Sequence, residues 1–415
     1  MFKRFLETRK EFPGQFWLLF IGMLISTIGS SMIWPFLTLY VSKKLGLPLT
    51  QIASLVTMNA VMGLVFSFIS GPITDRLGRK WVMVISLFVN GCMYVVMSKA
   101  DTFLAFAICQ CVMGAFNPLY RVGADAMMSD LIPPLQRSEA YSLLRMSNNL
   151  GVAIGPALGG FIASRSYTIA FLLAAAGLIF YSLLLAVRAH ETLPSEAAAS
   201  LKGKQIFSGY GHIFRDREFM GFTISFTFTT MLASLIWVLL PVYTNENFGL
   251  SEALYGWIPT TNAVMVVAFQ YVITQVTRKH KPLWVLAVGT AFYAVGTTSI
   301  AFFSGFWGFW LCMVVMTVGE LILIPTATTF SANQAPPDMR GRYMSVYNLT
   351  SSIASAVAPV LGGVLNDNLG PRTIWLGGGV IGLFSVCLFV TMATLFKNAG
   401  MPKKTTDATQ NVSPS

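Results

Sequence analysis

The stretch GPITDRLGRK, residues Gly71–Lys80, interrupts an otherwise apolar chain with one acid, two arginines, one lysine and two glycines. The charge-free run Leu45–Thr74 overlaps the start of this stretch, and the charge-free run Trp81–Ser98 follows it. A helix that spans a bilayer needs about 20 mainly apolar residues. The stretch is therefore expected to be a short charged loop between two transmembrane helices, and its charge and glycines require an explanation.

The whole chain has the composition of a membrane protein. Of its 415 residues, 54% are hydrophobic and only 11% are charged, whereas soluble domains carry about 25% charged residues. The run Pro282–Gly319 is too long for one helix, and the aromatic and glycine-containing segment Phe302–Gly308 divides it. Alternating polar residues, typical of barrel strands, are missing from these runs. We therefore predict an all-α membrane protein with twelve transmembrane helices, the other charge-free runs being Phe12–Ser42, Thr102–Tyr120, Met146–Ser164, Ser166–Val187, Phe219–Asn245, Ala253–Thr277, Tyr343–Asn366 and Thr373–Phe396.

The positive charges indicate topology rather than nucleic-acid binding. The formal net charge is +11, and with the N-terminus inside, 21 lysines and arginines fall in cytoplasmic segments against 5 on the other side. Positive residues concentrate in cytoplasmic loops of membrane proteins. The first apolar run is long and lacks a small-residue cleavage site, so it is interpreted as a retained helix and not a signal peptide. We expect a multi-pass protein of the plasma membrane with both termini in the cytoplasm.

The chain contains an internal repeat. A shift of 203 residues, without a gap, places Ile33 and Trp34 on Ile236 and Trp237, and the NAVM motif at Asn59 on the NAVM motif at Asn262. Because six helices is an even number, the two halves share one orientation in the membrane. We predict four segments: a first six-helix bundle over 1–188, a polar cytoplasmic linker over 189–217, a second bundle over 218–397 and a cytoplasmic tail over 398–415.

Together with this plan, the opening stretch resembles the signature loop between helices 2 and 3 of the major facilitator superfamily. The matching positions are Gly71, Asp75, Arg76, Gly78, Arg79 and Lys80. The resemblance implies a conformational gate, in which Gly71 permits close helix approach and Asp75 pairs with an arginine or a helix N-terminus. The alternative is a plain positively charged loop. The counterpart in the second half, TQVTRKHKP, keeps only the basic character.

A second motif resembles the helix 5 signature of the drug:proton antiporters within that superfamily. It is GVAIGPALGG, with the motif residues Gly151, Gly155, Pro156, Gly159 and Gly160, and AVAPVLGG at Ala356–Gly363 is its weaker echo. Small residues allow helices to approach closely, and a proline bends a helix. The resemblance implies an exporter, while simple helix packing is the alternative role for any one of these glycines.

Four charged residues lie inside predicted helices, namely Arg121, Asp125, Arg145 and Glu320. A charge in the membrane costs about 3 kcal/mol and usually marks a transport pathway. Glu320 lies near the membrane midplane without an obvious local partner, which makes it the predicted proton site, with Asp125 as the second candidate. Asp125 and Arg145 could also meet as a structural ion pair between helices 4 and 5. Arg121 lies on the same helix face as Asp125.

The resemblance also implies which helices line the transport cavity. Trp34, Tyr40, Asn117, Trp237 and Tyr243 lie on helices 1, 4 and 7, and they are the predicted substrate-cavity residues. Packing or membrane-interface positions are the alternative for each. The 203-residue shift places Glu320 on Asn117.

We therefore predict a secondary active transporter that exports hydrophobic or drug-like small molecules in exchange for protons. The alternative is a proton symporter or uniporter of a polar metabolite. An intramembrane enzyme or a scaffold is not expected, because the sequence contains neither a catalytic constellation nor a large soluble domain. The five cysteines fall in predicted spans and the three histidines in loops, without a zinc motif. No metal, cofactor or nucleic acid is expected. The GxxxxGK[ST] motif for ATP binding is missing. The expected partners are a small-molecule substrate, protons and the lipid bilayer, and the protein is expected to be a monomer.

Overall fold

The computed structural model describes residues 12–133, 136–193, 210–336 and 339–396. The predicted tail over 398–415 and residues 194–209 of the predicted linker lie outside these ranges. The described chain folds into helices, and no strand occurs within it. The first half consists of α2 (Gly14–Ile33), the 3₁₀ turn η1 (Trp34–Phe36), α3 (Leu37–Leu45), α4 (Leu49–Leu77), α5 (Arg79–Lys99), α6 (Phe103–Leu131), α7 (Arg137–Ala163) and α8 (Tyr167–Arg188).

The second half repeats this order after the short helix α9 (Tyr210–Arg215). Its helices are α10 (Arg217–Phe248), α11 (Glu252–Tyr255), α12 (Trp257–Thr277), α13 (Pro282–Ser299), α14 (Gly305–Gln334), α15 (Arg340–Leu369) and α16 (Thr373–Leu395). Nine of the described helical spans are long and apolar enough to cross a membrane. The other long helices, α7, α12 and α13, occupy the same bundles. The protein is thus an all-α, multi-pass membrane protein.

The first predicted run is interrupted where proline removes a backbone donor. Pro35 lies in η1, which divides the run into α2 and α3. The equivalent helix α10 contains Pro241 and stays continuous. Both runs end at a glycine in the left-handed conformation, Gly46 with φ 61° and Gly249 with φ 64°, which is the usual way to terminate a helix. These glycines are related by the 203-residue repeat.

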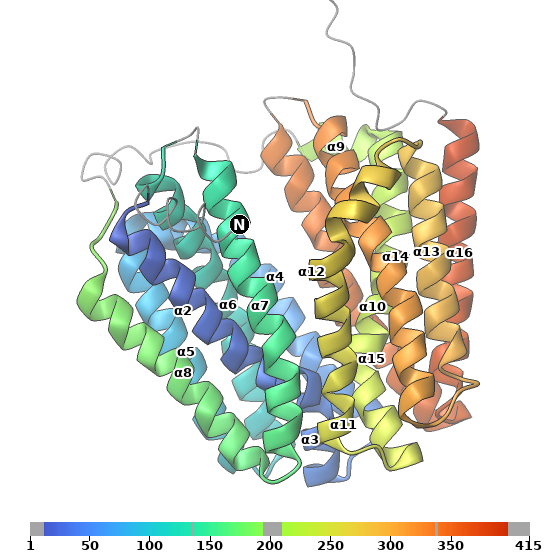
Figure 1. The fold of residues 1–415 in the computed structure, drawn as a ribbon, viewed down its shortest axis with the longest axis horizontal. Coiled ribbons are helices and arrows are strands. Elements are labelled where there is room, and N and C mark those ends of the chain that lie inside the picture. The colour runs from blue at the N-terminus through green and yellow to red at the C-terminus, as the bar shows by residue number, and fades with distance from the viewer. Residues whose placement is uncertain (1–11, 134–135, 194–209, 337–338, 397–415) are drawn as a thin grey trace, which may run out of the picture.

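The two halves have equivalent internal packing, as the repeat requires. Helix α4 packs on α6 as α12 packs on α14, and α2 packs on α7 as α10 packs on α15. The pairs α5 with α8 and α13 with α16 are equivalent in the same way. Between the halves, α4 packs on α15 and α12 packs on α7. Figure 1 shows the two groups of helices side by side, with α3 and α11 between them at one end.

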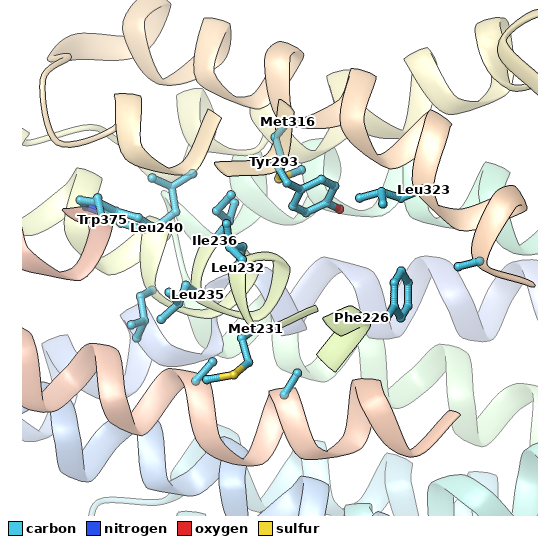
Figure 2. Close-up of a cluster of buried hydrophobic side chains, with 14 of the residues drawn as sticks. Phe226, Met231, Leu232, Leu235, Ile236, Leu240, Tyr293, Met316, Leu323 and Trp375 are labelled. Atoms are coloured by element: carbon cyan, nitrogen blue, oxygen red, sulfur yellow. The ribbon is translucent and has the colours of Figure 1, made fainter. Parts of the chain in front are cut away.

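Each half has its own apolar core, and apolar residues also cover the outside. In the second half, the ring of Trp375 is fully buried, and Leu232 and Met316 are fully buried in the same cluster. Figure 2 shows these residues with Phe226, Tyr293 and other members of the cluster. On the outer surface, residues such as Val187, at 79% exposed, and Val267, at 64%, expose large apolar side chains. Such a surface fits hydrocarbon rather than water.

The halves meet mainly on one side of the bundle. We call this side the closed face; it contains the ends of α3, α7, α10 and α15 and the short helix α11. The opposite side, where α8 ends and α10 begins, is called the linker face. Figure 1 shows the two groups of helices separating towards the linker face, at the top of the view. The structure therefore represents one conformation of a two-part molecule, joined on the closed face.

Candidate transport site

An ion pair joins the two halves on the closed face. Lys43 Nζ in α3 lies 2.5 Å from Glu252 Oε1 in α11, and the Tyr167 hydroxyl donates to the same oxygen at 2.8 Å. The adjacent Ser42 hydroxyl of α3 donates to Glu246 of α10. Burial alone would raise the pKa of Glu252, but the hydrogen bonds from Lys43, the backbone and Tyr167 outweigh it and lower this pKa below its ordinary value.

A carboxylate also caps a helix across the same interface. Asp367 near the end of α15 accepts hydrogen bonds from the backbone N–H groups of Leu49 at 3.1 Å and Thr50 at 2.9 Å, and from the Thr50 hydroxyl at 2.6 Å. These N–H groups belong to the first turn of α4, where backbone N–H groups have no partner within their own helix. The negative charge at a helix N-terminus is favourable. The second half thus supplies the N-cap of a helix in the first half.

The helix 5 signature forms close contacts both within the first half and between halves. A Cβ on Gly155 would overlap Ser31 of α2, and one on Gly159 would overlap the Met32 backbone. A Cβ on Gly160 would meet the carbonyl oxygen of Glu252, and one on Gly256 would meet the carbonyl oxygen of Pro156. The glycines of the motif therefore allow α7 to pack against α2 and against the start of α12.

A cavity with two connected compartments lies between the halves. The first, which we call the inner compartment, has a volume of about 360 Å³. The second, which we call the Arg121 compartment because Arg121 lines it, has a volume of about 480 Å³. Both are within the usual range of small-molecule sites. Four residues line both compartments: Thr27, Asn59, Asn117 and Tyr120. The lining comes mostly from the first half, with Val238 of α10 closing the inner compartment and α15 serines facing the Arg121 compartment.

The structure places some predicted cavity residues at this site and others away from it. Trp34 and Asn117 line the inner compartment. Trp237 packs edge-on against Trp34, with ring centroids 5.3 Å apart. Tyr40 and Tyr243, in contrast, do not line the cavity. Both are buried within their own halves, Tyr40 against Phe106, Tyr167 and Phe171, and Tyr243 against Phe248, Phe309 and Trp375.

The expected ion pair between Asp125 and Arg145 is not formed. Both side chains are exposed, and no ion pair within the described ranges includes either residue. The reason is the packing of their helices: α6 packs on α4 and α5, whereas α7 packs on α2 and α12. Arg145 instead lies close enough to interact electrostatically with Tyr347 of α15. Arg121, one turn from Asp125, lines the Arg121 compartment.

Glu320 lies inside the second half and not on the cavity wall. Asn262 Nδ2 of α12 donates to Glu320 Oε2 at 2.7 Å and to Thr317 Oγ1 at 3.0 Å. The Tyr293 hydroxyl of α13 interacts with the same carboxyl group. Asn262, Tyr293 and Thr317 are all buried. The carboxyl group thus links three helices, α12, α13 and α14.

The repeat relates this cluster to three asparagines of the first half. The 203-residue shift places Asn262, Tyr293 and Glu320 on Asn59, Asn90 and Asn117. Asn90 Nδ2 donates to Asn117 Oδ1 at 3.1 Å, and all three asparagines line the inner compartment. Sequence reasoning identified Glu320 and Asn117 but missed the other four. Applying the shift to every polar residue of the predicted helices would have found them.

The charged stretch Gly71–Lys80 is not a loop as expected, because α4 continues to Leu77 and α5 begins at Arg79, which leaves only Gly78 outside a helix. The stretch forms its contacts within the first half. Arg79 lies 3.5 Å from Asp75 and 3.2 Å from Asp130, and Glu191 accepts hydrogen bonds from the backbone N–H groups of Arg79 and Lys80. Gly78 adopts φ 89°, which favours glycine. Arg76 is exposed. The close helix approach expected at Gly71 does not occur in this conformation, because a Cβ there would meet no atom within 4 Å beyond its own turn of helix.

Two equivalent helical halves around a central cavity, joined on one face, are the architecture of secondary membrane transporters. The sequence profile of the Major Facilitator Superfamily matches residues 19–243 and 222–414. The chain belongs to that superfamily, as the signature loop indicated.

Curated relatives span nearly the whole chain at low identity. The chain is 24% identical to the uncharacterized MFS-type transporter YqjV of Bacillus subtilis, with 91% of each chain covered. It is 25% identical to a Na(+), Li(+), K(+)/H(+) antiporter of Planococcus maritimus, over 88% of this chain and 92% of the relative. It is 24% identical to the multidrug resistance protein MdtH of Escherichia coli, over 90% of this chain and 92% of the relative. These relatives are membrane transporters.

Solved structures share the fold. A mutant of the nucleoside transporter NupG has a TM-score of 0.78 at 12% identity, covering 91% of this chain and 99% of that chain. A bacterial homolog of the human lysosomal transporter Spinster, in an inward-facing and occupied conformation, has a TM-score of 0.75 at 12% identity, covering 92% and 97%. The all-α, two-half fold predicted from the sequence is confirmed.

Proposed function

We propose that the protein exports hydrophobic or drug-like small molecules in exchange for protons, from the cytoplasmic linker face to the outer closed face of the plasma membrane. The excess of basic residues in the linker-face segments supports this orientation. The helix 5 signature and the resemblance to a multidrug resistance protein and a cation/proton antiporter support the direction and the coupling. In this scheme the two halves rock around the central cavity.

The observation that carries the proposal is the position of Glu320. The carboxyl is separate from the cavity wall but is hydrogen-bonded to Asn262 of α12, and α12 is one of the helices that packs across the interface onto α7. Two further hydrogen bonds tie α12 to α14, from Trp310 Nε1 to Thr261 at 2.9 Å and from Gln270 to the Leu321 carbonyl at 3.0 Å. A proton gained or lost at Glu320 would change the bonds that position α12. The packing of α12 against α7 would change as a result.

The test uses the full-length protein in proteoliposomes with an imposed pH gradient and the uncharged dye Nile red. Glu320→Gln keeps the shape and hydrogen bonding of the side chain but cannot exchange a proton. It should lose gradient-driven export and substrate-induced proton flux while retaining dye counterflow without a gradient. Glu139→Gln, which removes an exposed carboxyl in the first turn of α7, should behave as wild type. Full uphill export by a well-folded Glu320→Gln protein with unchanged pH dependence would exclude Glu320 as the proton site and make Asp125 the next candidate.

One observation favours the alternative, a symporter or uniporter of a polar metabolite. The inner compartment carries four amide side chains, those of Asn59, Asn90, Gln110 and Asn117. Amides suit a ligand with several hydrogen-bonding groups. The direction of the gradient separates the two functions: an exporter moves substrate against the proton flux, and a symporter moves it with the proton flux.

A further inference from the structure

The Arg121 compartment contains a cation without an ion-pair partner in the described part of the chain. Arg121 of α6 lines this space, and no ion pair of the described residues includes it. A guanidinium group stays charged at any physiological pH. A charge at this depth is unfavourable in a membrane protein unless water or a partner surrounds it. The position of Arg121 on the cavity wall therefore leaves the partner to come from the transported molecule or from solvent.

Other polar groups on the lining of the Arg121 compartment can donate hydrogen bonds. Ser351, Ser352 and Ser355 of α15 line this compartment, and their hydroxyls form no hydrogen bond with another residue in the described ranges. Asn148 uses its carbonyl oxygen to accept from Thr27 at 3.1 Å, which leaves its amide N–H groups available. A guanidinium, three hydroxyls and an amide around one space form a surface that suits a negatively charged oxygen.

The nearest acid acts on Arg121 without forming an ion pair with it. Asp125 lies one turn from Arg121 towards the linker face and interacts with it electrostatically, but it forms no ion pair with it among the described residues, and it does not line either compartment. The inner compartment has no charged lining residue. Its wall combines amides with the aromatic rings of Trp34, Tyr94 and Tyr120. Arg121 is thus the single charged residue on the described lining of the two compartments.

We propose that the cavity selects molecules that carry one acidic group, such as a carboxylate, bound by Arg121, with an uncharged aromatic or amide-bearing body in the inner compartment. A monoanion matches the one guanidinium, whereas a dianion would leave an uncompensated charge and a cation would be repelled. This inference names the substrate class of the proposed exporter. It rests on the proposed function only in taking this cavity as the transport site.

The experiment measures binding without a proton gradient, so it does not depend on coupling or direction. The full-length protein in nanodiscs of zwitterionic lipid is titrated with three probes of similar shape: 1-naphthaleneacetate, 1-naphthaleneacetamide and 1-naphthylmethylammonium. The wild type should bind the carboxylate about tenfold or more tightly than the neutral amide, since hydrogen bonds to charged groups are the stronger kind. The cation should bind most weakly. Arg121→Gln should abolish the preference while keeping amide binding, and Arg121→Lys should restore part of it.

Arg145→Gln is the matched control. It removes the same charge from the next helix, at a residue that lines neither compartment, and it should leave the preference unchanged. Three results would overturn the inference: no preference for the carboxylate in the wild type, including no binding of any probe at millimolar concentration; an unchanged preference in Arg121→Gln; or an equal loss in Arg145→Gln, which would indicate general electrostatic attraction. A retained carboxylate preference without gradient-driven export of 1-naphthaleneacetate would contradict the proposed transport mode alone.

Discussion

The indole rings of Trp34 and Trp237 meet edge to face with centroids 5.3 Å apart, and these two residues occupy the same position in the two copies of the repeat. A pair of equivalent residues can touch only where the axis that relates the halves passes between them. The contact therefore lies on the axis between the halves, next to the inner compartment that Trp34 lines. Each half contributes one ring to the same junction.

The energy of this junction can be measured by a double-mutant cycle. Aromatic pairs contribute about 0.5–1.5 kcal/mol beyond the burial of area. We expect Trp34→Ala and Trp237→Ala to show a coupling energy in this range when unfolding free energies are measured in detergent. The control pair Trp34→Ala with Trp375→Ala joins residues whose rings contact different partners, Trp237 and Tyr243, and its coupling should be close to zero. A zero coupling for the first pair would mean that the rings adjoin without attraction.

The closed face should open when the Lys43–Glu252 ion pair is removed. In a background without native cysteines, Ser30→Cys places a thiol in the inner compartment. A membrane-impermeant maleimide added on the closed face should label this thiol faster in Glu252→Gln. The matched control is Asp101→Asn, because Asp101 pairs with Lys44 at 2.7 Å on the same face but within the first half. Equal labelling in both variants would show that the ion pair does not hold the halves together.

The same assay has an expected pH dependence. Because the closed state holds the pKa of Glu252 below its ordinary value of 4.5, the ion pair stabilises the closed face fully above that pH. This stabilisation is lost as the pH falls through the lowered pKa. Because a maleimide reacts with the thiolate, the labelling rate is divided at each pH by that of a small free thiol in solution. This normalised labelling of Ser30→Cys in the otherwise wild-type protein should be constant from about pH 8 to 5 and increase only below the ordinary carboxyl pKa. An increase near neutral pH would indicate control by a different group.

Two glycines of the sequence motifs should differ in their tolerance of substitution. A side chain on Gly160 would collide with the backbone of α11, so Gly160→Val should prevent closure and increase labelling from the closed face. Gly71→Ala meets no atom in this conformation, and an alanine within a helix is about 0.5–1 kcal/mol more favourable than glycine. We expect the thermal stability of Gly71→Ala to be equal to or above that of the wild type. Reduced stability would indicate that Gly71 is packed in this state.

Asp125 and Arg145 should act independently. The two side chains are both exposed on helices that pack on different partners, so the effects of Asp125→Asn and Arg145→Gln on stability should add within about 0.3–0.5 kcal/mol. A buried ion pair would behave differently, because the loss of one partner typically costs about 3–5 kcal/mol and loss of the second recovers much of it. Expression and thermal stability of the singles and the double variant distinguish these cases.

The sequence was most informative where a repeat or a composition constrained the answer. The 203-residue shift predicted two equivalent halves and paired Glu320 with Asn117 before their surroundings were known. It could not predict which face of a helix meets the cavity. Tyr40 and Tyr243 are related by the repeat and predicted as cavity residues, yet they are buried in their own halves, because transmembrane helices are apolar on every side and lack the polar stripe that orients soluble helices.

The separation of Asp125 from Arg145 was also outside the reach of sequence. Consecutive helices are usually neighbours, but here α6 and α7 pack on different partners. The signature loop was identified correctly, whereas its partners Asp130 and Glu191 come from the ends of other helices and depend on the fold. The residues around Glu320 could have been found from the repeat. The surroundings of Arg121 could not be predicted from the sequence, because they depend on which side chains of the neighbouring helices line the same compartment.

The unequal contribution of the two halves to the cavity has an evolutionary consequence. After a duplication both copies began with the same residues, but the first now carries nearly all the side chains that line the two compartments, while the second keeps the Glu320 carboxyl among buried partners. Mutations selected by a new compound can therefore accumulate in α4, α5 and α6 without disturbing Glu320. The set of molecules that the cavity binds can therefore change during evolution while Glu320 and its hydrogen-bond partners in the second half are retained.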